Sequence, residues 1–199
     1  MFFNRKKAFN EDSLDSILEA CTEGDARAQK ALIGMFYGYA KSISLRYAGS
    51  EEDAEEIVND GFLKVFKNLH RYEPVQPFKA WLRTIFTNTS IDYYRKNLKY
   101  SMHVHDDDFD LNDENEYILS HISAKEILGM IQKLPDSYRI AFTMYAVDGY
   151  SHKEIADMLG IREGTSKSNV RDARKKLQAM MKQLYPEAYQ SFENKKGLL

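Results

Sequence analysis

Apolar residues recur at helical spacing between Asp148 and Leu177, and the rest of the chain is best interpreted from this stretch. Two sets, spaced by three and four positions, give the inner edges of two helices: Ile155, Ala156 and Leu159 in the first, and Val170, Ala173 and Leu177 in the second. Gly160 and Ile161 form a tight break between these helices. A short helix, a glycine break and a longer helix together predict a helix-turn-helix.

The polar side of the second helix carries short polar and basic side chains. At about 100° per residue these fall opposite or beside the apolar edge, and Asp172 alone interrupts the positive run. An ordinary solvated helix face usually carries charges of both signs, so the pattern favours a helix that lies in the major groove of DNA. The residues expected to contact DNA are Arg162, Thr165, Lys167, Ser168, Arg171, Arg174 and Lys175.

The same periodicity predicts helices on both sides of the middle of the chain. Those in the first half run from Leu14 to a stop near Gly24, from Ala28 to a stop at Gly49, from a Ser50 cap to Leu69, and from Phe78 to about Asn97. Those in the second half run from Ala124 to a break at Pro135, and through Ala141 to Gly149. Because Pro74 and Pro77 force the residues before them towards extended conformations, residues 70–77 are expected to form a shaped loop.

The composition suits a helical protein with a real core. The chain has 199 residues, 43% hydrophobic content and only four prolines, so we expect an all-α fold of two small helical domains. It has no N-terminal apolar segment and no apolar run long enough to span a membrane, which gives the expectation of a cytoplasmic protein without membrane insertion. The single cysteine, Cys21, lies at helical spacing from Leu14 and Leu18, so we expect a buried thiol.

Charge is unevenly distributed along the chain. The net charge of −2 divides into 0 for residues 1–97, −6 for residues 98–120 and +4 for residues 121–199. Residues 98–120 also lose the apolar period and contain the run DDDFDLNDENE, so we expect an acidic flexible linker there. It separates a first domain at 1–97 from the helix-turn-helix domain at 121–184, and a polar tail follows at 185–199. The basic second domain can attract phosphate while the linker repels it.

Acidic residues crowd the first turns of the third predicted helix. They are Glu51, Glu52, Asp53, Glu55 and Glu56. Acids at a helix N-terminus interact favourably with the helix dipole and so stabilise the helix. An acidic face also suits a basic protein partner. The charges alone leave these two interpretations equal.

The fourth predicted helix combines an aromatic inner face with a basic outer face. Trp81 and Phe86 fall at helical spacing with the apolar residues, which favours a place in the core over stacking on bases. At and just after the end of the helix, tyrosines lie among basic residues, a mixture that weakly indicates single-stranded nucleic acid. These residues are Tyr93, Tyr94, Arg95, Lys96, Lys99 and Tyr100.

Three blocks carry a resemblance to a known family. They read AEEIVNDGFLKVFKNL at 54–69, FKAWLRTIFTNTSIDYYRK at 78–96, and LPDSYRIAFTMYAVDGYSHKEIADMLGIREGTSKSNVRDARKKL at 134–177. In order and spacing they resemble the sigma subunits of bacterial RNA polymerase, in the two-domain branch called extracytoplasmic-function sigma factors. The resemblance covers most of residues 12–184.

The resemblance implies a dissociable subunit that binds core RNA polymerase, selects promoters and helps to melt them. The domain at 1–97 would read the minus-ten element, and the domain at 121–184 would read the minus-thirty-five element. The implied partners are promoter DNA, the β′ clamp helices and the β flap of the polymerase, and a possible anti-sigma factor. No catalytic residue, metal or cofactor is implied.

The resemblance also implies two sets of site residues in the first domain. Those that would bind the polymerase are Asp53, Glu55, Glu56, Asn59, Asp60, Phe62 and Leu63. Those that would read the minus-ten element and capture a flipped base are Tyr72, Val75, Gln76, Lys79, Arg83, Asn88, Tyr93, Arg95 and Lys96. Unstacking a base costs a few kcal/mol per step, so a melting protein needs a pocket for that base and positive charge for the single strand.

Some residues depart from the family pattern. Ser166 stands where the family usually has valine, which would either thin the packing of the recognition helix or expose a hydroxyl. Arg162 occupies a place often held by a capping residue and is expected to contact phosphate instead. Asn59 and the pair Asn169-Val170 also depart from the common residues. These differences put the promoter sequence in question, though not the activity.

Two other classes of function remain to be compared with this interpretation. A helix-turn-helix regulator that acts without polymerase would bind duplex DNA tightly by itself. A metal-dependent sensor or enzyme is suggested by His103, His105 and Asp106, but an acidic linker lacks the rigid element that holds metal ligands. The chain also lacks a nucleophile–base set and a phosphate-binding glycine loop, so we do not expect an enzyme.

Overall fold

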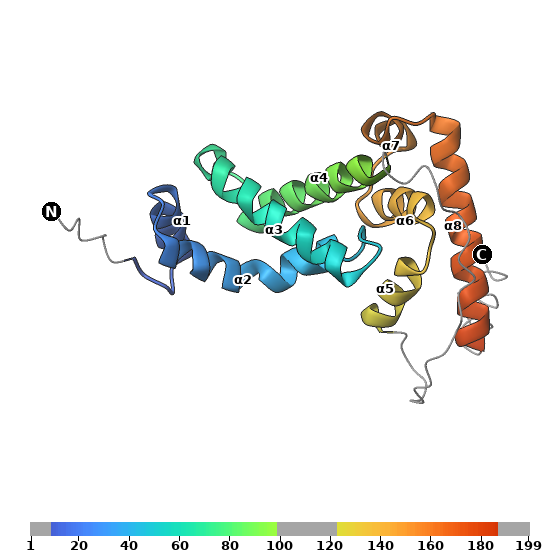
Figure 1. The fold of residues 1–199 in the computed structure, drawn as a ribbon, viewed down its shortest axis with the longest axis horizontal. Coiled ribbons are helices and arrows are strands. Elements are labelled where there is room, and N and C mark those ends of the chain that lie inside the picture. Colours follow the sequence, from blue (N-terminus) through green and yellow to red (C-terminus); the bar gives the residue numbers. More distant parts are fainter. Residues whose placement is uncertain (1–8, 99–122, 187–199) are drawn as a thin grey trace, which may run out of the picture. The chain divides into compact units, whose positions relative to one another are not determined.

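The computed structural model describes residues 9–98 and 123–186, and every regular element in these two ranges is helical (Figure 1). The expectation of an all-α fold is therefore confirmed. The elements are α1 (Leu14–Thr22), α2 (Ala26–Ser44), α3 (Glu51–Asn68), the 3-10 helix η1 (Leu69–Arg71), α4 (Phe78–Leu98), α5 (Ala124–Gln132), α6 (Asp136–Phe142), the π-helix η2 (Thr143–Val147), α7 (His152–Leu159) and α8 (Glu163–Leu184).

The chain divides into two compact units, Met1–Tyr93 and Tyr94–Leu199. The boundary expected after residue 97 falls in the last turn of α4, a helix that continues across this division. Apart from Leu98, the expected linker at 98–120 lies outside the described residues, as does all but the start of the tail at 185–199.

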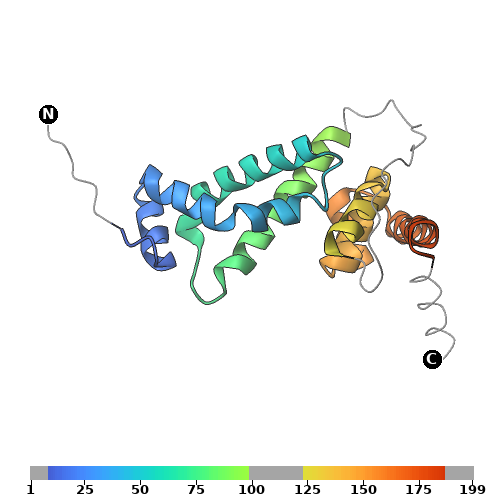
Figure 2. The same cartoon turned by 90° about the horizontal axis from the view of Figure 1, so that it is seen from below.

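In the first unit, α2, α3 and α4 lie side by side around an aromatic core (Figure 2). Phe62 of α3 contacts Phe86 of α4 edge to face, with ring centroids 5.2 Å apart, and Phe36 of α2 meets Phe78 of α4 at the same distance. Such aromatic pairs add to the energy gained by burial alone. Cys21 of α1 is buried, as expected, and this burial raises the pKa of its thiol to about 11.

Gly61 determines how closely α3 can approach α4. A Cβ atom at this position would lie 2.2 Å from Cε1 of Phe86, a side chain that is fully buried. Helix separation depends on the side chains at the contact. The two helices can therefore come this close only because α3 has no side chain at this point.

The start of α3 follows the sequence signal, whereas the end of α2 does not. Ser50 caps α3, and its hydroxyl accepts a hydrogen bond from the amide of Asp53 at 3.1 Å. The expectation that Gly49 stops α2 is wrong, because the helix already ends at Ser44. Two hydrogen-bonded turns follow, in which Tyr47 and Ala48 are buried, so packing of these side chains redirects the chain before the glycine.

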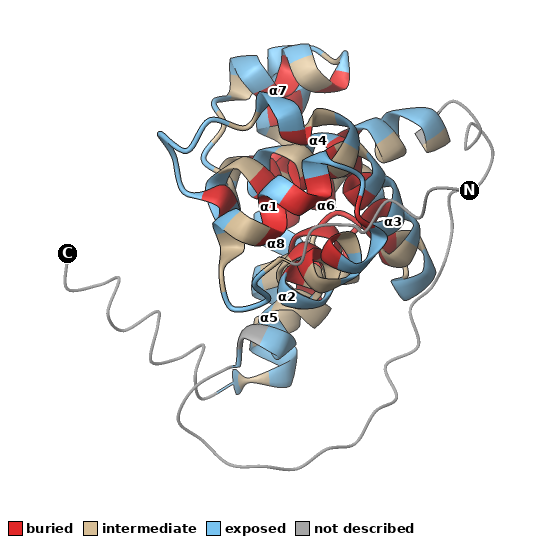
Figure 3. Cartoon of the chain, turned by 90° about the vertical axis from the view of Figure 1, so that its left-hand side faces the viewer, coloured by how far each residue is buried: buried red, intermediate tan, exposed pale blue. Residues whose placement is uncertain are grey.

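The second unit packs α5, α6 and α7 against α8, and η2 against α6 and α7. Its core includes Ile140, Met144, Ile155, Leu159 and Val170, and Figure 3 shows the buried residues of these helices in red. The break between α5 and α6 lies at Pro135, as expected. The helix expected through Ala141 to Gly149 is divided into α6, which ends at Phe142, and the π-helix η2, which ends at Val147.

A buried arginine joins α5 to α6. Arg139 is only 3% exposed, and it donates hydrogen bonds to the carbonyl oxygens of Gln132 and Leu134 and pairs with Asp136 at 2.6 Å. A buried charge is tolerated when it is paired and its donors are satisfied. This side chain therefore closes the end of α5, and the apolar period carried no signal for it.

Candidate nucleic-acid and partner interfaces

The helices α7 and α8 form the expected helix-turn-helix. A capping box opens α7, in which the Ser151 hydroxyl accepts from the amide of Glu154 while the Glu154 carboxylate accepts from the amide of Ser151. The helix ends at Gly160, whose φ of 68° lies in the left-handed region that favours glycine. After this turn α8 runs past Leu177 to Leu184.

The side of α8 away from Val170 and Ala173 is exposed and largely basic. Ser168 is half-buried, and its hydroxyl donates to the carbonyl oxygen of Thr165 at 2.9 Å. The other residues expected to contact DNA are exposed: Arg162, Thr165, Lys167, Arg171, Arg174 and Lys175. Arg162 occupies the N-cap position without a capping hydrogen bond from its side chain.

Two of these cations are paired with acids of their own helix. Lys167 Nζ lies 2.7 Å from Glu163 Oε1, and Arg171 Nε lies 2.9 Å from Asp172 Oδ1. The hydrogen bonds from these cations lower the pKa of Glu163 and of Asp172, and the Asp172 carboxylate raises the pKa of Arg171. Because the four side chains are 31% to 63% exposed, water and salt screen both pairs, and DNA phosphates can compete for the cations.

Ser166 makes a polar contact between α7 and α8. It is fully buried, and its hydroxyl oxygen lies 3.0 Å from Nδ1 of His152. The His152 ring stacks on Tyr145 with ring centroids 4.4 Å apart, and the guanidinium of Arg174 lies over Tyr145 at 5.4 Å. Of the two alternatives for Ser166, exposure of its hydroxyl is therefore wrong. At this position the buried hydrogen bond between Ser166 and His152 replaces the apolar contact that the family's usual valine would make.

The loop between η1 and α4 projects beyond the helices of the first unit (Figure 2). Tyr72 shapes it from the inside, because its ring packs on Phe78 and Trp81 at centroid distances of 5.1 and 5.5 Å and its hydroxyl donates to the carbonyl oxygen of Gln76. Val75 is 87% exposed. The loop therefore presents Val75 and Gln76 outward and holds Tyr72 against α4.

The outer face of α4 carries the expected polar and basic side chains. Phe86 is fully buried and Trp81 is partly buried against the core, so both belong to the core as predicted. The Nζ atom of Lys79 lies over the ring of Tyr39 at 5.8 Å. The exposed residues of the minus-ten set on this helix are Lys79, Arg83, Asn88, Arg95 and Lys96.

Tyr93 and Asp53, which were expected on different surfaces, bind each other. The Tyr93 hydroxyl donates to Asp53 Oδ1 at 2.6 Å, and both side chains are half-buried between α4 and α3. This bond engages the groups by which they would contact nucleic acid and polymerase. The bond gives both side chains a structural role, and their contacts with nucleic acid and with polymerase stay predictions.

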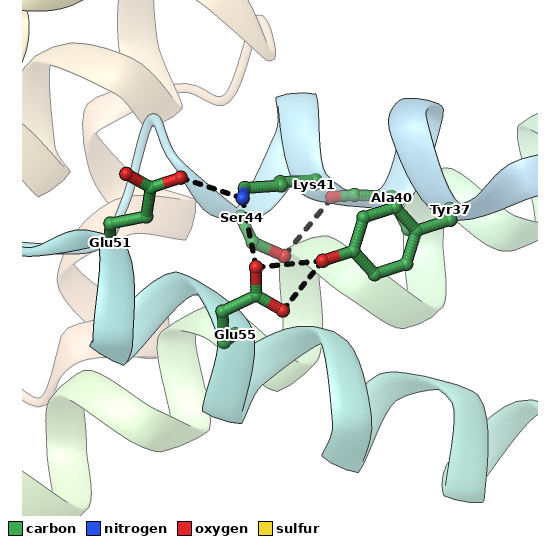
Figure 4. Close-up of polar contacts among 6 residues, drawn as sticks. All are labelled: Tyr37, Ala40, Lys41, Ser44, Glu51 and Glu55. Carbon is green, nitrogen blue, oxygen red and sulfur yellow. Dashed lines mark hydrogen bonds and ion pairs between the residues drawn. The ribbon is translucent and has the colours of Figure 1, made fainter.

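Glu55 is held by side chains of α2 at the junction with α3 (Figure 4). The Tyr37 hydroxyl lies 2.7 and 2.6 Å from the two carboxylate oxygens of Glu55, and Lys41 Nζ lies 2.8 Å from Glu55 and 2.7 Å from Glu51. Hydrogen bonds from Lys41 and then from Tyr37 lower the pKa of Glu55, while the two carboxylates raise the pKa of Lys41. Glu55 thus stabilises the helix pair and is less available to a partner than the sequence suggested.

The remaining acidic residues of α3 form an exposed face. Phe62 does not belong to it, because its side chain is 4% exposed and packs against Phe86 in the core. The burial of Phe62 therefore gives no support to its predicted contact with a partner, which stays a prediction. We define the α3 face by its exposed members Glu56, Asn59, Asp60 and Leu63, of which Leu63 is 57% exposed.

Sequence reasoning missed the residues that position these surfaces. Tyr37 and Lys41 orient Glu55 from another helix, and no spacing along the chain relates residues on different helices. His152 carried no signal beyond its place at the start of α7. Asp172 was noticed only as a break in the positive run, although its position beside Arg171 could have suggested the ion pair.

The metal hypothesis concerned His103, His105 and Asp106, which lie outside the described residues. Within residues 9–98 and 123–186, no group of three potential ligand side chains is placed to hold a metal ion. None of the helices in these ranges is both long enough and apolar enough to cross a membrane.

Two family models match separate parts of the chain. Residues 32–99 match the family model for sigma-70 region 2, and residues 124–177 match the model for sigma-70, region 4. The ECF RNA polymerase sigma factor SigM of Bacillus subtilis (strain 168) is 31% identical over 130 residues, which cover 64% of this chain and 78% of that relative. The sigma factor SigE of Mycolicibacterium smegmatis is 28% identical over 155 residues, covering 75% of this chain and 60% of its own length.

A more distant relative and a solved structure match larger shares of their own chains. The sigma-E factor of Haemophilus influenzae is 23% identical over 179 residues, covering 82% of this chain and 92% of that relative. The sigma factor RpoE of Bartonella quintana, solved in complex with the anti-sigma factor NepR, is 22% identical with a TM-score of 0.45 and covers 77% of this chain and 96% of its own.

A helix-turn-helix with a basic outer face, carried on one chain with a sigma-70 region 2 unit, defines a DNA-binding factor of transcription initiation. The chain belongs to the extracytoplasmic-function sigma factors of the sigma-70 family. It is thus an RNA polymerase sigma factor for promoter recognition and transcription initiation.

Proposed function

We propose that this sigma factor uses three separate surfaces: the α3 face for core polymerase, the loop at residues 72–77 with α4 for the minus-ten element, and the basic side of α8 for the minus-thirty-five element. The observation that carries the proposal is the separation of charge. Exposed acids gather on α3 in the first unit, while exposed cations gather on α8 in the second.

On α3, the proposed polymerase contact combines carboxylates with an apolar centre. Glu56 and Asp60 offer negative charge, and Leu63 offers an exposed apolar side chain beside them. This combination suits a basic helical partner such as the β′ clamp helices, because charge steers the encounter and apolar area stabilises the docked state. The β flap is the proposed partner of the second unit, and an anti-sigma factor is the proposed inhibitor.

For melting, the proposal assigns base capture to the loop and strand retention to α4. Val75 and Gln76 lie at the exposed loop, and Lys79, Arg83 and Asn88 follow on the outer face of the helix. A flipped base needs a shaped receptor, and the single strand that it leaves needs positive charge. No hydrolytic step by this chain is required, so we propose a non-catalytic protein that acts in the cytoplasm with the polymerase.

The deciding experiment is run-off transcription with purified core polymerase on a pool of genomic fragments. We expect the full chain to direct initiation at discrete promoters and to bind duplex DNA weakly until core enzyme is added. Tight, specific duplex binding by the isolated chain without any effect on initiation would favour a regulator that works without polymerase.

A second experiment separates melting from binding. We expect Asn88→Ala and Arg95→Ala to reduce permanganate reactivity of the promoter while closed complexes still form. Lys30→Ala, an exposed change on α2, provides the control for loss of a surface side chain in the first unit, where Asn88 also lies. Normal opening in both variants would assign melting to the loop alone.

A further inference from the structure

Asp172 lies beside Arg171 on the exposed side of α8 and accepts two hydrogen bonds from one edge of its guanidinium. Arg171 Nε donates to Oδ1 at 2.9 Å, and Nη2 donates to Oδ2 at 3.3 Å. The arginine side chain is 63% exposed and the aspartate side chain 31% exposed. A carboxylate is unexpected on a face that meets phosphates, since it opposes binding to DNA of any sequence.

The geometry of the pair leaves one edge of the guanidinium free. A guanidinium has five N–H donors in a planar fork, and Asp172 takes one from Nε and one from Nη2. Both donors of Nη1 and the second donor of Nη2 remain. This remaining edge offers two parallel donors, an arrangement that matches the O6 and N7 acceptors of guanine in the major groove.

Other cations of α8 are held differently. Lys167 pairs with Glu163 at 2.7 Å, but its ammonium is a point charge without a fixed fork. Arg174 lies over the Tyr145 ring, which does not engage a particular edge of the guanidinium. Among the α8 residues that the structure describes, Arg171 alone has both its plane and its free edge determined by a carboxylate.

We propose that Asp172 is a positioning residue that orients Arg171 to read one guanine of the minus-thirty-five element through its Nη1–Nη2 edge. The proposal rests on the proposed role of α8 in recognising that element. Asp172 has two effects: it fixes the arginine for the correct base, and its negative charge weakens binding to all other sequences. Both effects raise specificity.

The test uses holoenzyme assembled from core polymerase and the full chain, on a promoter library randomised in the upstream element. Wild type is expected to enrich guanine at one position, and Arg171→Ala is expected to lose that preference. In Asp172→Ala the guanine preference at the same position should fall about tenfold, while the other positions keep theirs. Binding of the variant to random duplex should rise, because one negative charge has been removed.

Glu163→Gln is the matched control, since it removes one negative charge and the partner of a lysine on the same helix. It should raise binding to random duplex without changing the guanine preference. In the double variant Arg171→Ala, Asp172→Ala, the second change should leave base preference as it is in Arg171→Ala alone.

Two results overturn the inference while leaving the proposed function intact. One is a retained guanine preference in Asp172→Ala, and the other is an equal loss of preference at every position. A wild-type holoenzyme without any upstream preference would instead overturn the proposed role of α8, and this inference with it.

Discussion

The helices α3 and α8 both carry dense charge, yet they hold it in different ways. On α3 two of the charged residues contact side chains of other helices that hold them: Glu55 binds Tyr37 and Lys41 of α2, and Asp53 accepts from Tyr93 of α4. On α8 the paired cations are held by acids of the same helix, as in Lys167–Glu163 and Arg171–Asp172. Contacts between helices stabilise the fold and occupy the hydrogen-bonding atoms of the charged groups. Exposed pairs within one helix are weak, so their charged groups remain available to a ligand.

The acids within α3 differ in the same way, because some bond to α2 and others remain exposed. Glu55 bonds to Tyr37 and Lys41 of α2, and Glu51 pairs with Lys41 although its side chain is 70% exposed, while Glu56 and Asp60 remain exposed on the α3 face. We therefore propose that stabilisation of the helix pair and partner binding fall to different acidic residues of α3. We expect substitutions in these two groups of acids to have different effects.

The largest effect is expected where α3 packs most closely. In Gly61→Ala the new Cβ would meet the Phe86 ring at 2.2 Å, so the two helices must separate, at a cost of about 1 to 3 kcal/mol. Urea unfolding followed by the fluorescence of Trp81, the only tryptophan, reports on this unit. Gly34→Ala on α2, where nothing lies within 4 Å of an added Cβ atom, should instead stabilise by up to about 1 kcal/mol.

Charge reversal on the α3 face should weaken the association with core polymerase. Glu56→Lys and Asp60→Lys place positive charge against the proposed basic partner, and we expect each to lower affinity about tenfold or more. Titration of labelled full chain with core enzyme measures this. Glu23→Lys, the same change on an exposed residue after α1, should leave affinity unchanged; an equal loss there would indicate a general charge effect.

Removing the polar contact between α7 and α8 should loosen the helix-turn-helix. Ser166→Ala deletes a fully buried hydroxyl that pairs with His152, and the expected loss is about 1 kcal/mol. Native-state hydrogen exchange of the α7 and α8 amides measures stability in this unit alone. Ser168→Ala removes a hydroxyl bonded only within α8 and should have a smaller effect; equal effects would argue against the contact.

The smallest effect concerns the acid sensitivity of the α2–α3 junction. Because hydrogen bonds from Lys41 and Tyr37 lower the pKa of Glu55, its contribution is complete above the ordinary glutamate pKa and is lost as the pH falls through the lowered value. From about pH 5 downward, Glu55→Gln should therefore lose less stability than wild type in urea unfolding followed by Trp81. Glu52→Gln, an exposed acid of the same helix, should follow wild type.

The helices themselves were predictable because their signals are local. The capped start at Ser50, the left-handed Gly160 and the apolar stripes of α4 and α8 all depend on residues within a few positions of each other. The prediction for Gly49 failed because burial of Tyr47 and Ala48 ended α2 earlier. Tertiary packing outweighed a local stop signal there.

By itself the sequence determined an all-helical chain, its helix-turn-helix, its family and the basic outer side of α8, since each of these follows from spacing or motif. Only the tertiary structure decided which residues of the charged faces remain free. Phe62 is buried, Tyr93 and Asp53 bind each other, and Glu55 is held by α2. The physical reason is that a side chain's availability depends on what packs against it from elements distant in the chain, and periodicity gives the direction of a side chain but not the partner that it meets.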